Sequence, residues 1–201
     1  SASNFLSLVA ARNAFYQETR FADVFASLTR APISLRERIA EIPGVAAVET
    51  RIVKDVRLDW PRSSISVSGR IQSLSVSGQE ALNKLILVDG RWPDPSRRDE
   101  ILVHVAFAET WGIGPGDDLT AVLNGRRQTF EIVGIVHSPE YIYATRPGLP
   151  FPDDRTFVAM WIDEAGLASA FDMEASFNDV ALKLAPGASG ARVIADLDRL
   201  L

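Results

Sequence analysis

Alternation of apolar and polar residues predicts β-strands near both ends of the chain. Residues 21–29, 48–60 and 177–184 each repeat with a period of two, the period of a half-buried strand. The segment 48–60 is long for one strand, so we expect a bend or a bulge in it. The apolar sides of the three segments are Val24, Ala26 and Leu28; Val48, Thr50, Ile52, Val56, Leu58 and Trp60; and Val180, Leu182 and Leu184.

Three other stretches follow the helical period, namely residues 4–17, 34–42 and 191–201. The second opens with Ser34-Leu35-Arg36-Glu37, a capping box in which two side chains satisfy free donors of the first helical turn. Pro43-Gly44 ends it. The apolar stripe predicted for the last helix consists of Val193, Ile194, Leu197, Leu200 and Leu201.

Between these ends the sequence predicts short strands and two short helices. Asn124-Gly125 is a strong type I′ hairpin signal, because both residues tolerate positive φ. The Ser- and Gly-rich stretch 61–77 changes its apolar phase, which places a boundary near residue 69. The expected strands are 85–88, 100–103, 117–123, 128–136 and 156–161, and the expected helices are 106–111 and 163–171, with Asp163 as a cap.

This order predicts an α+β protein. An α/β subdomain built from both chain ends, residues 1–69 and 170–201, is interrupted by a smaller inserted β-rich subdomain, residues 70–169. Such an interruption is tolerated because the termini of a domain usually lie close together.

Composition narrows the function classes. The 201 residues are 47% hydrophobic, as in a folded globular protein, and the absence of cysteine excludes disulfides and thiolate metal sites. The net charge is −5, and the middle segment, residues 70–169, holds 14 acidic and 9 basic residues. A protein without a basic face is not expected to bind nucleic acid. The chain has no run of about 18 apolar residues that would span a bilayer.

Candidate catalytic motifs fail in detail. Glu100 and His104 have helical ligand spacing but lie in an expected strand, and His137-Ser138 are neighbours that point to opposite faces of a strand. The glycine-rich stretch 112–116 follows a helix and precedes a strand, the reverse of a phosphate loop. We read it as a turn that Asp117 helps to form. We therefore predict no catalytic, cofactor or metal site.

The loop 138–152 is the candidate contact surface. It contains Pro139, Glu140, Tyr141 and Tyr143, and aromatic residues in loops are typical interface anchors. The alternative, that the loop folds onto its own subdomain and buries the tyrosines, stays open.

The order of several segments resembles the extracytoplasmic core domain of MacB/FtsX-type ABC transporter permeases. Single motifs are weak, but their order and spacing extend over nearly the whole chain. The segments are Ile42-Pro43-Gly44-Val45; the strand ending in Gly90-Arg91; Asp99-Glu100-Ile101-Leu102-Val103; Phe107-Ala108 leading to Trp111-Gly112 and Gly116-Asp117; Ile132-Val133-Gly134-Ile135-Val136; and Phe177-Asn178-Asp179-Val180.

The resemblance implies a porter-like α/β subdomain with an inserted second subdomain, placed in the periplasm or another extracytoplasmic space of an inner-membrane protein. The first and last helices would continue into membrane helices, through which a cytoplasmic ATPase subunit drives the domain. The domain itself would carry no chemistry and would pass motion to a periplasmic adaptor or a substrate. A homodimer or a paired permease is the implied assembly. The alternative is a secreted solute-binding domain or an enzyme of another kind.

Overall fold

The structure is a computed structural model that describes residues 14, 16–74, 82–141 and 154–201. Ten strands and four helices follow one another along these residues. They are β1 (Val24–Pro32), α2 (Leu35–Ala40), β2 (Val45–Arg51), β3 (Val53–Asp59), β4 (Val67–Ser73), β5 (Ile86–Gly90), β6 (Glu100–His104), α3 (Val105–Trp111), β7 (Asp118–Leu123), β8 (Arg126–His137), β9 (Phe157–Ile162), α4 (Glu164–Phe171), β10 (Ser176–Leu184) and α5 (Gly190–Leu200).

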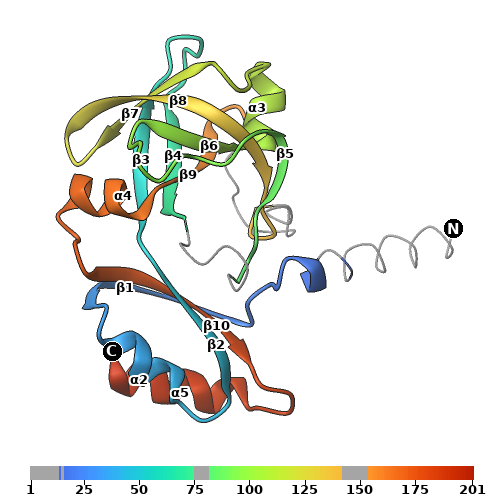
Figure 1. The fold of residues 1–201 in the computed structure, drawn as a ribbon, viewed down its shortest axis with the longest axis vertical. Helices are drawn as coiled ribbons and strands as arrows, with labels where there is room; N and C mark the ends of the chain where they lie inside the picture. Colours follow the sequence, from blue (N-terminus) through green and yellow to red (C-terminus); the bar gives the residue numbers. More distant parts are fainter. Residues whose placement is uncertain (1–13, 15, 75–81, 142–153) are drawn as a thin grey trace, which may run out of the picture.

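The smaller lobe is a three-stranded antiparallel sheet with the order β1-β10-β2 (Figure 1). Helices α2 and α5 pack on one face of the sheet. As predicted, the strand 177–184 pairs with strands from the beginning of the chain and not with the middle segment. The core contains the predicted apolar sides of these strands together with Ile39, Val193 and Leu197.

The larger lobe is a barrel. Its strands have the order β5-β8-β6-β9-β4-β3-β7, and an additional pairing of β7 with β8 closes the ring, leaving β5 as an extra strand (Figure 1). Alternate residues of the strands point inward and fill it, as the two-residue period requires. Inward-facing residues include Val56 and Leu58, Ile101 and Val103, Leu119, Ala121 and Leu123, and Val158, Met160 and Ile162.

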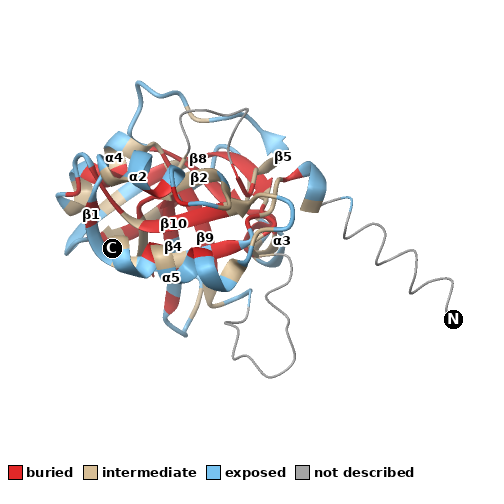
Figure 2. Cartoon of the chain, turned by 90° about the horizontal axis from the view of Figure 1, so that it is seen from below, coloured by how far each residue is buried: buried red, intermediate tan, exposed pale blue. Residues whose placement is uncertain are grey.

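Helices α3 and α4 complete the barrel core through Phe107, Ala108, Leu167 and Ala168. Asp163 caps α4 as predicted, because its carboxylate accepts a hydrogen bond from the Gly166 amide at 3.2 Å. Figure 2 shows the buried residues concentrated in the strands, with β4, β8, β9 and β10 among them. In the part of the chain that the structure describes, no helix is both long and apolar enough to cross a membrane.

The sequence misplaced the first boundary between the lobes. The segment 48–60 divides at Ile52 into β2, which belongs to the small sheet, and β3, which belongs to the barrel. Residue 69 lies inside β4, a barrel strand, so the inserted unit begins near residue 52 and its sheet has seven strands against three. The predicted bend was correct, but alternation is the same on both sides of it and does not reveal a change of sheet. The inserted unit is therefore not the smaller one.

Two local predictions were also wrong. Ser34 adopts helical dihedral angles, and its side chain makes no capping hydrogen bond, so the predicted capping box does not form. In α5, Ile194 and Leu201 are 45% and 44% exposed, because the small sheet covers only the side of the helix that carries Val193 and Leu197. Most of the first predicted helix, residues 4–17, lies outside the described residues.

Candidate functional site: the junction between the two lobes

The chain passes from the small sheet into the barrel at Ile52. At this point the backbone makes hydrogen bonds with side chains of both lobes. The Ile52 amide donates to Ser73 Oγ of β4 at 2.9 Å, and the Ser73 amide donates to the Ile52 carbonyl at 3.0 Å. One residue later, the side chain of Asn178 in β10 pairs with both backbone groups of Val53, at 2.8 and 2.9 Å. Adjacent residues are thus tied to different lobes, which restricts rotation of one lobe against the other.

Arg51, the last residue of β2, is the centre of a polar network at this crossing. It is 9% exposed. Its guanidinium donates to Asp179 Oδ1 of the small sheet at 2.8 Å and to Glu140 Oε1, beyond the end of the barrel strand β8, at 2.6 Å. It also donates to Gln72 Oε1 of β4 at 3.2 Å. A single buried cation therefore connects both lobes, and charge-assisted bonds of this kind are the strong ones.

The network contains more acid than base. Glu49, Glu140 and Asp179 surround Arg51, and burial is the main reason that the pKa of Glu49 is raised to about 7. Arg51 opposes this shift, whereas the charges of Glu140 and Asp179 add to it. Among the described residues, Glu49 Oε2 is a buried oxygen without a hydrogen-bond partner. Glu49 is therefore the group of the junction that binds a proton near neutral pH, because burial disfavours its charged form more than Arg51 favours it.

A cavity of about 440 Å³ adjoins the network. Glu49, Arg51 and Glu140 line it together with Trp92 and Trp161. Asn83 helps to close this region, since its amide donates to Glu140 Oε1 at 3.2 Å and its carbonyl accepts from the Ala22 amide at 2.9 Å. The cavity combines an aromatic wall with a few polar groups, as small-molecule sites do.

Three of the four predicted contact residues are described, and they face the protein. Pro139 is buried, and Glu140 pairs with Arg51. Tyr141 packs on the outer face of the barrel, 5.7 Å from the Trp161 ring and 5.8 Å from the His104 ring, and Gln72 Nε2 donates to its hydroxyl. Burial raises the pKa of the Tyr141 phenol. Tyr141 therefore follows the alternative in which the loop folds onto its own subdomain.

Tyr143 lies outside the described residues. Whether the loop 138–152 binds a partner stays a prediction.

Among the residues of the rejected catalytic motifs, Glu100, His104 and Ser138 have structural partners. In the described part of the chain, His104 Nε2 and His137 Nδ1 are buried without a hydrogen-bond partner. Glu100 is buried and binds Arg91 Nη1 at 3.0 Å and the Asp94 amide at 2.7 Å, while His104 caps α3 through Nδ1, which accepts from the Ala106 amide at 3.2 Å. Ser138 Oγ accepts from the Glu140 amide at 3.2 Å. The described residues contain no group of three or more His, Asp or Glu side chains that could hold a metal ion.

The glycine-rich stretch is a turn. Gly116 has a φ of 95°, and Asp117 Oδ2 accepts from the Gly114 amide at 2.9 Å, as the sequence predicted.

Sequence reasoning missed the junction itself. Glu49 and Arg51 lie on the charged side of a half-buried strand, where the pattern predicts solvent. One signal for the junction was available in the sequence. Asp179 is a carboxylate in the last, largely apolar strand, and a buried carboxylate needs a cation as its partner.

Comparison with solved structures shows a similar fold in a transporter domain. Over 85% of this chain and 86% of the other, the fold matches the extracellular domain of YknZ, a noncanonical ABC-type transporter from Gram-positive bacteria, with 14% identity and a TM-score of 0.51. The periplasmic region of MacB from Actinobacillus actinomycetemcomitans is similar over 84% of this chain and 72% of its own, with 11% identity and a TM-score of 0.48. No protein-family model and no characterised protein matches the sequence.

The resemblance inferred from segment order is thus confirmed at the level of the fold. The fold is similar to that of the extracellular domain of YknZ.

Proposed function

We propose that this chain is the extracytoplasmic domain of an ABC transporter permease and transmits ATP-driven motion of membrane helices to a periplasmic partner or substrate. The observation that carries the proposal is the fold shared with the YknZ domain over 85% of the chain. Export, lipoprotein release and envelope regulation are all functions that such motion serves.

The junction suggests how motion would pass through the domain. A force applied to the small lobe reaches the barrel through the chain crossing at Ile52 and through Arg51, which binds Asp179 on one side and Glu140 on the other. A buried, fully paired guanidinium resists displacement, because separating it leaves unpaired charges in a low-dielectric site. The two lobes would therefore move as one lever.

Transport by the full-length permease tests this coupling. We expect Arg51→Met to lower the amount of substrate transported per ATP hydrolysed while ATP hydrolysis itself continues. Arg127→Met is the matched control, since Arg127 forms an exposed ion pair with Asp59 within the barrel. Unchanged transport by Arg51→Met in a folded protein would contradict the lever.

The partners expected on this proposal are a cytoplasmic ATPase subunit, reached through membrane helices, and a periplasmic adaptor. A homodimer or paired permease is the expected assembly, with the membrane part in the cell inner membrane. Affinity purification of the membrane-embedded full-length protein tests these expectations directly. Apolar stretches of about 20 residues on either side of this segment in the full gene product would support the permease.

The cavity of about 440 Å³ favours a second candidate, a solute-binding domain that does not transmit force. The two candidates differ in where the substitutions act. For a solute-binding domain, Trp161→Ala would abolish ligand binding by the isolated chain. Arg51→Met would not change the amount of substrate transported per ATP hydrolysed by a transporter that uses this domain.

A further inference from the structure

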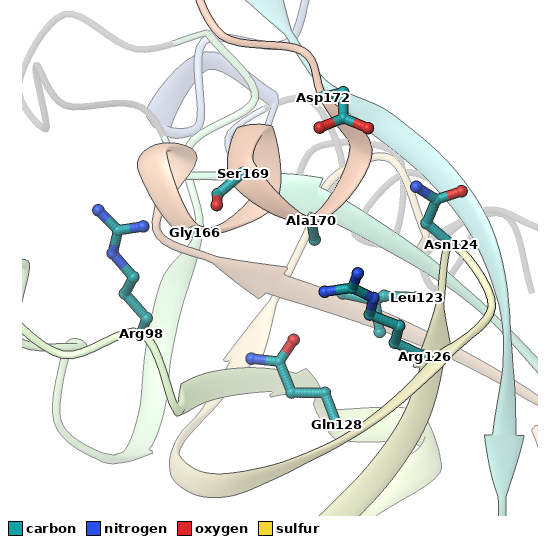
Figure 3. A pocket seen from close by; sticks show the side chains of 9 residues that line it. All are labelled: Arg98, Leu123, Asn124, Arg126, Gln128, Gly166, Ser169, Ala170 and Asp172. Carbon is teal, nitrogen blue, oxygen red and sulfur yellow. The ribbon is translucent and has the colours of Figure 1, made fainter.

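A second hollow, of about 400 Å³, lies between α4 and the β7–β8 hairpin (Figure 3). It shares no lining residue with the cavity at the junction. Arg126 and Gln128 come from one face of β8, since they are two positions apart in the strand, and Asn124 comes from the turn that precedes it. Ser169 comes from the facing side of α4. The hollow is thus built from two regular elements of the barrel lobe.

The local backbone holds these side chains in place. Asn124 and Gly125 form the predicted turn with φ values of 50° and 78°, which fixes the start of β8 beside α4. At the C-terminal end of α4, Asp172 adopts a left-handed conformation, and its carbonyl accepts from Arg30 Nη1 at 2.7 Å. The β7–β8 hairpin and α4 are therefore held in position by contacts outside the hollow. The side chains inside the hollow are not needed for this.

Two guanidinium groups flank the hollow without an ion pair. Among the described residues, neither Arg98 nor Arg126 lies within ion-pair distance of a carboxylate, although the neighbouring Arg97 and Arg127 pair with Asp99 and Asp59. In Figure 3, Arg98 and Arg126 stand on two sides of the hollow, with Ser169 and Gln128 between them. The lining contains one carboxylate, Asp172, against two arginines, so it carries a positive charge in a protein of net charge −5.

We propose that this hollow binds a small polar molecule through an oxyanion group, a carboxylate or a phosphate, held between Arg98 and Arg126. The planar guanidinium matches both groups because it offers two parallel donors. Gln128 and Ser169 supply neutral donors, and Asn124 lies at the rim. The volume, about 400 Å³, is in the range of small-molecule sites and larger than a lone ion needs. Since the net charge repels anions at long range, the attraction is local to the two arginines.

Titration of the 201-residue chain with citrate, glycerol 3-phosphate and inorganic phosphate tests the site. We expect saturable binding of at least one organic probe by calorimetry, with the largest NMR shift changes at the amides of Gln128 and Ser169. A response to citrate alone assigns a carboxylate ligand, and a response to glycerol 3-phosphate alone assigns a phosphate ester. Arg126→Ala and Arg98→Ala should each weaken binding roughly tenfold or more, which corresponds to about 1.4 kcal/mol per factor of ten.

Arg127→Ala is the matched control. It removes an exposed arginine next to Arg126 that pairs with Asp59 and does not line the hollow, so binding should stay within twofold of the parent chain. Ser169→Glu should abolish binding by placing a negative charge and added bulk inside. The proposal is overturned if no probe binds saturably, or if Arg127→Ala weakens binding as much as Arg126→Ala does.

Discussion

Arg51 and Asp179 are direct partners across two adjacent antiparallel strands, and their side chains form a buried ion pair, with Arg51 Nε 2.8 Å from Asp179 Oδ1. The same guanidinium reaches Glu140 beyond the end of β8. The ion pair is therefore part of both the small sheet and the contact between the lobes, and its removal affects both.

Arg51→Met should destabilise the fold by about 3–5 kcal/mol, because it leaves two carboxylates buried without their cation. Urea unfolding measures this difference. The control Arg127→Met breaks an ion pair whose side chains are 70% and 44% exposed and should change stability by less than about 1 kcal/mol. Equal effects of the two substitutions would show that Arg51 is not a buried structural cation.

Glu49 should make the protein less stable as the pH rises. Its pKa is about 7 in the folded state against 4.5 ordinarily, so the folded state binds the extra proton between these values. Stability contributed by the protonated form is complete below about pH 4.5 and is lost as the pH rises to 7. Glu49→Gln cannot ionise, and we expect it to stabilise by on the order of 2 kcal/mol at pH 8 and to have little effect at pH 4. Urea unfolding over this pH range would contradict the assignment if the gain were equal at both ends.

His104 should make the protein less stable as the pH falls. Burial and the nearby His137 lower its pKa to about 4 from 6.5, so the unfolded chain binds the extra proton between these values and stability falls as the pH drops from 6.5 to 4. His104→Asn keeps an acceptor for the Ala106 amide without a titrating group. The free energy of unfolding of this variant should not fall as the pH drops from 6.5 to 4. Below pH 6.5 the variant should therefore be as stable as the parent chain or more stable. Parallel pH profiles for variant and parent would refute the assignment.

Tyr141 should stabilise the fold mainly through the packing of its ring. Tyr141→Ala removes a ring that contacts Trp161 and His104, and we expect a loss of about 2–4 kcal/mol. Tyr141→Phe keeps the ring and loses the bond to Gln72, so about 1 kcal/mol should be lost. Thermal unfolding of both variants measures the difference.

This result also bears on the predicted contact loop. A partner-binding test that replaces Tyr141 by alanine would confound binding with unfolding. Tyr141→Phe combined with Tyr143→Ala is the better variant, and weakened partner binding by this folded double variant would support the contact.

Local features of this protein could be predicted from local sequence. The two-residue alternation located β1, β2, β3 and β10, Asn124-Gly125 marked the hairpin turn, and Asp163 marked the start of α4, because each depends on residues within a few positions of one another. The bend in the segment 48–60 was expected from the length of the segment. The capping box at Ser34 failed although its pattern was complete, since the pattern does not determine the dihedral angles of the capping residue.

The sequence by itself determined where most of the strands and turns lie, that the strand 177–184 returns to the beginning of the fold, and the order of segments that resembles the permease domains, but it did not locate β4. Only the tertiary structure decided that β2 and β3 separate into different sheets at Ile52, that β7 and β8 close a barrel, and that Arg51 is buried. The physical reason is that alternation reports which face of a strand is apolar but not what covers the other face. Glu49 and Arg51 lie on a polar face, and residues of the second lobe that are distant in sequence, such as Glu140, help to remove them from water.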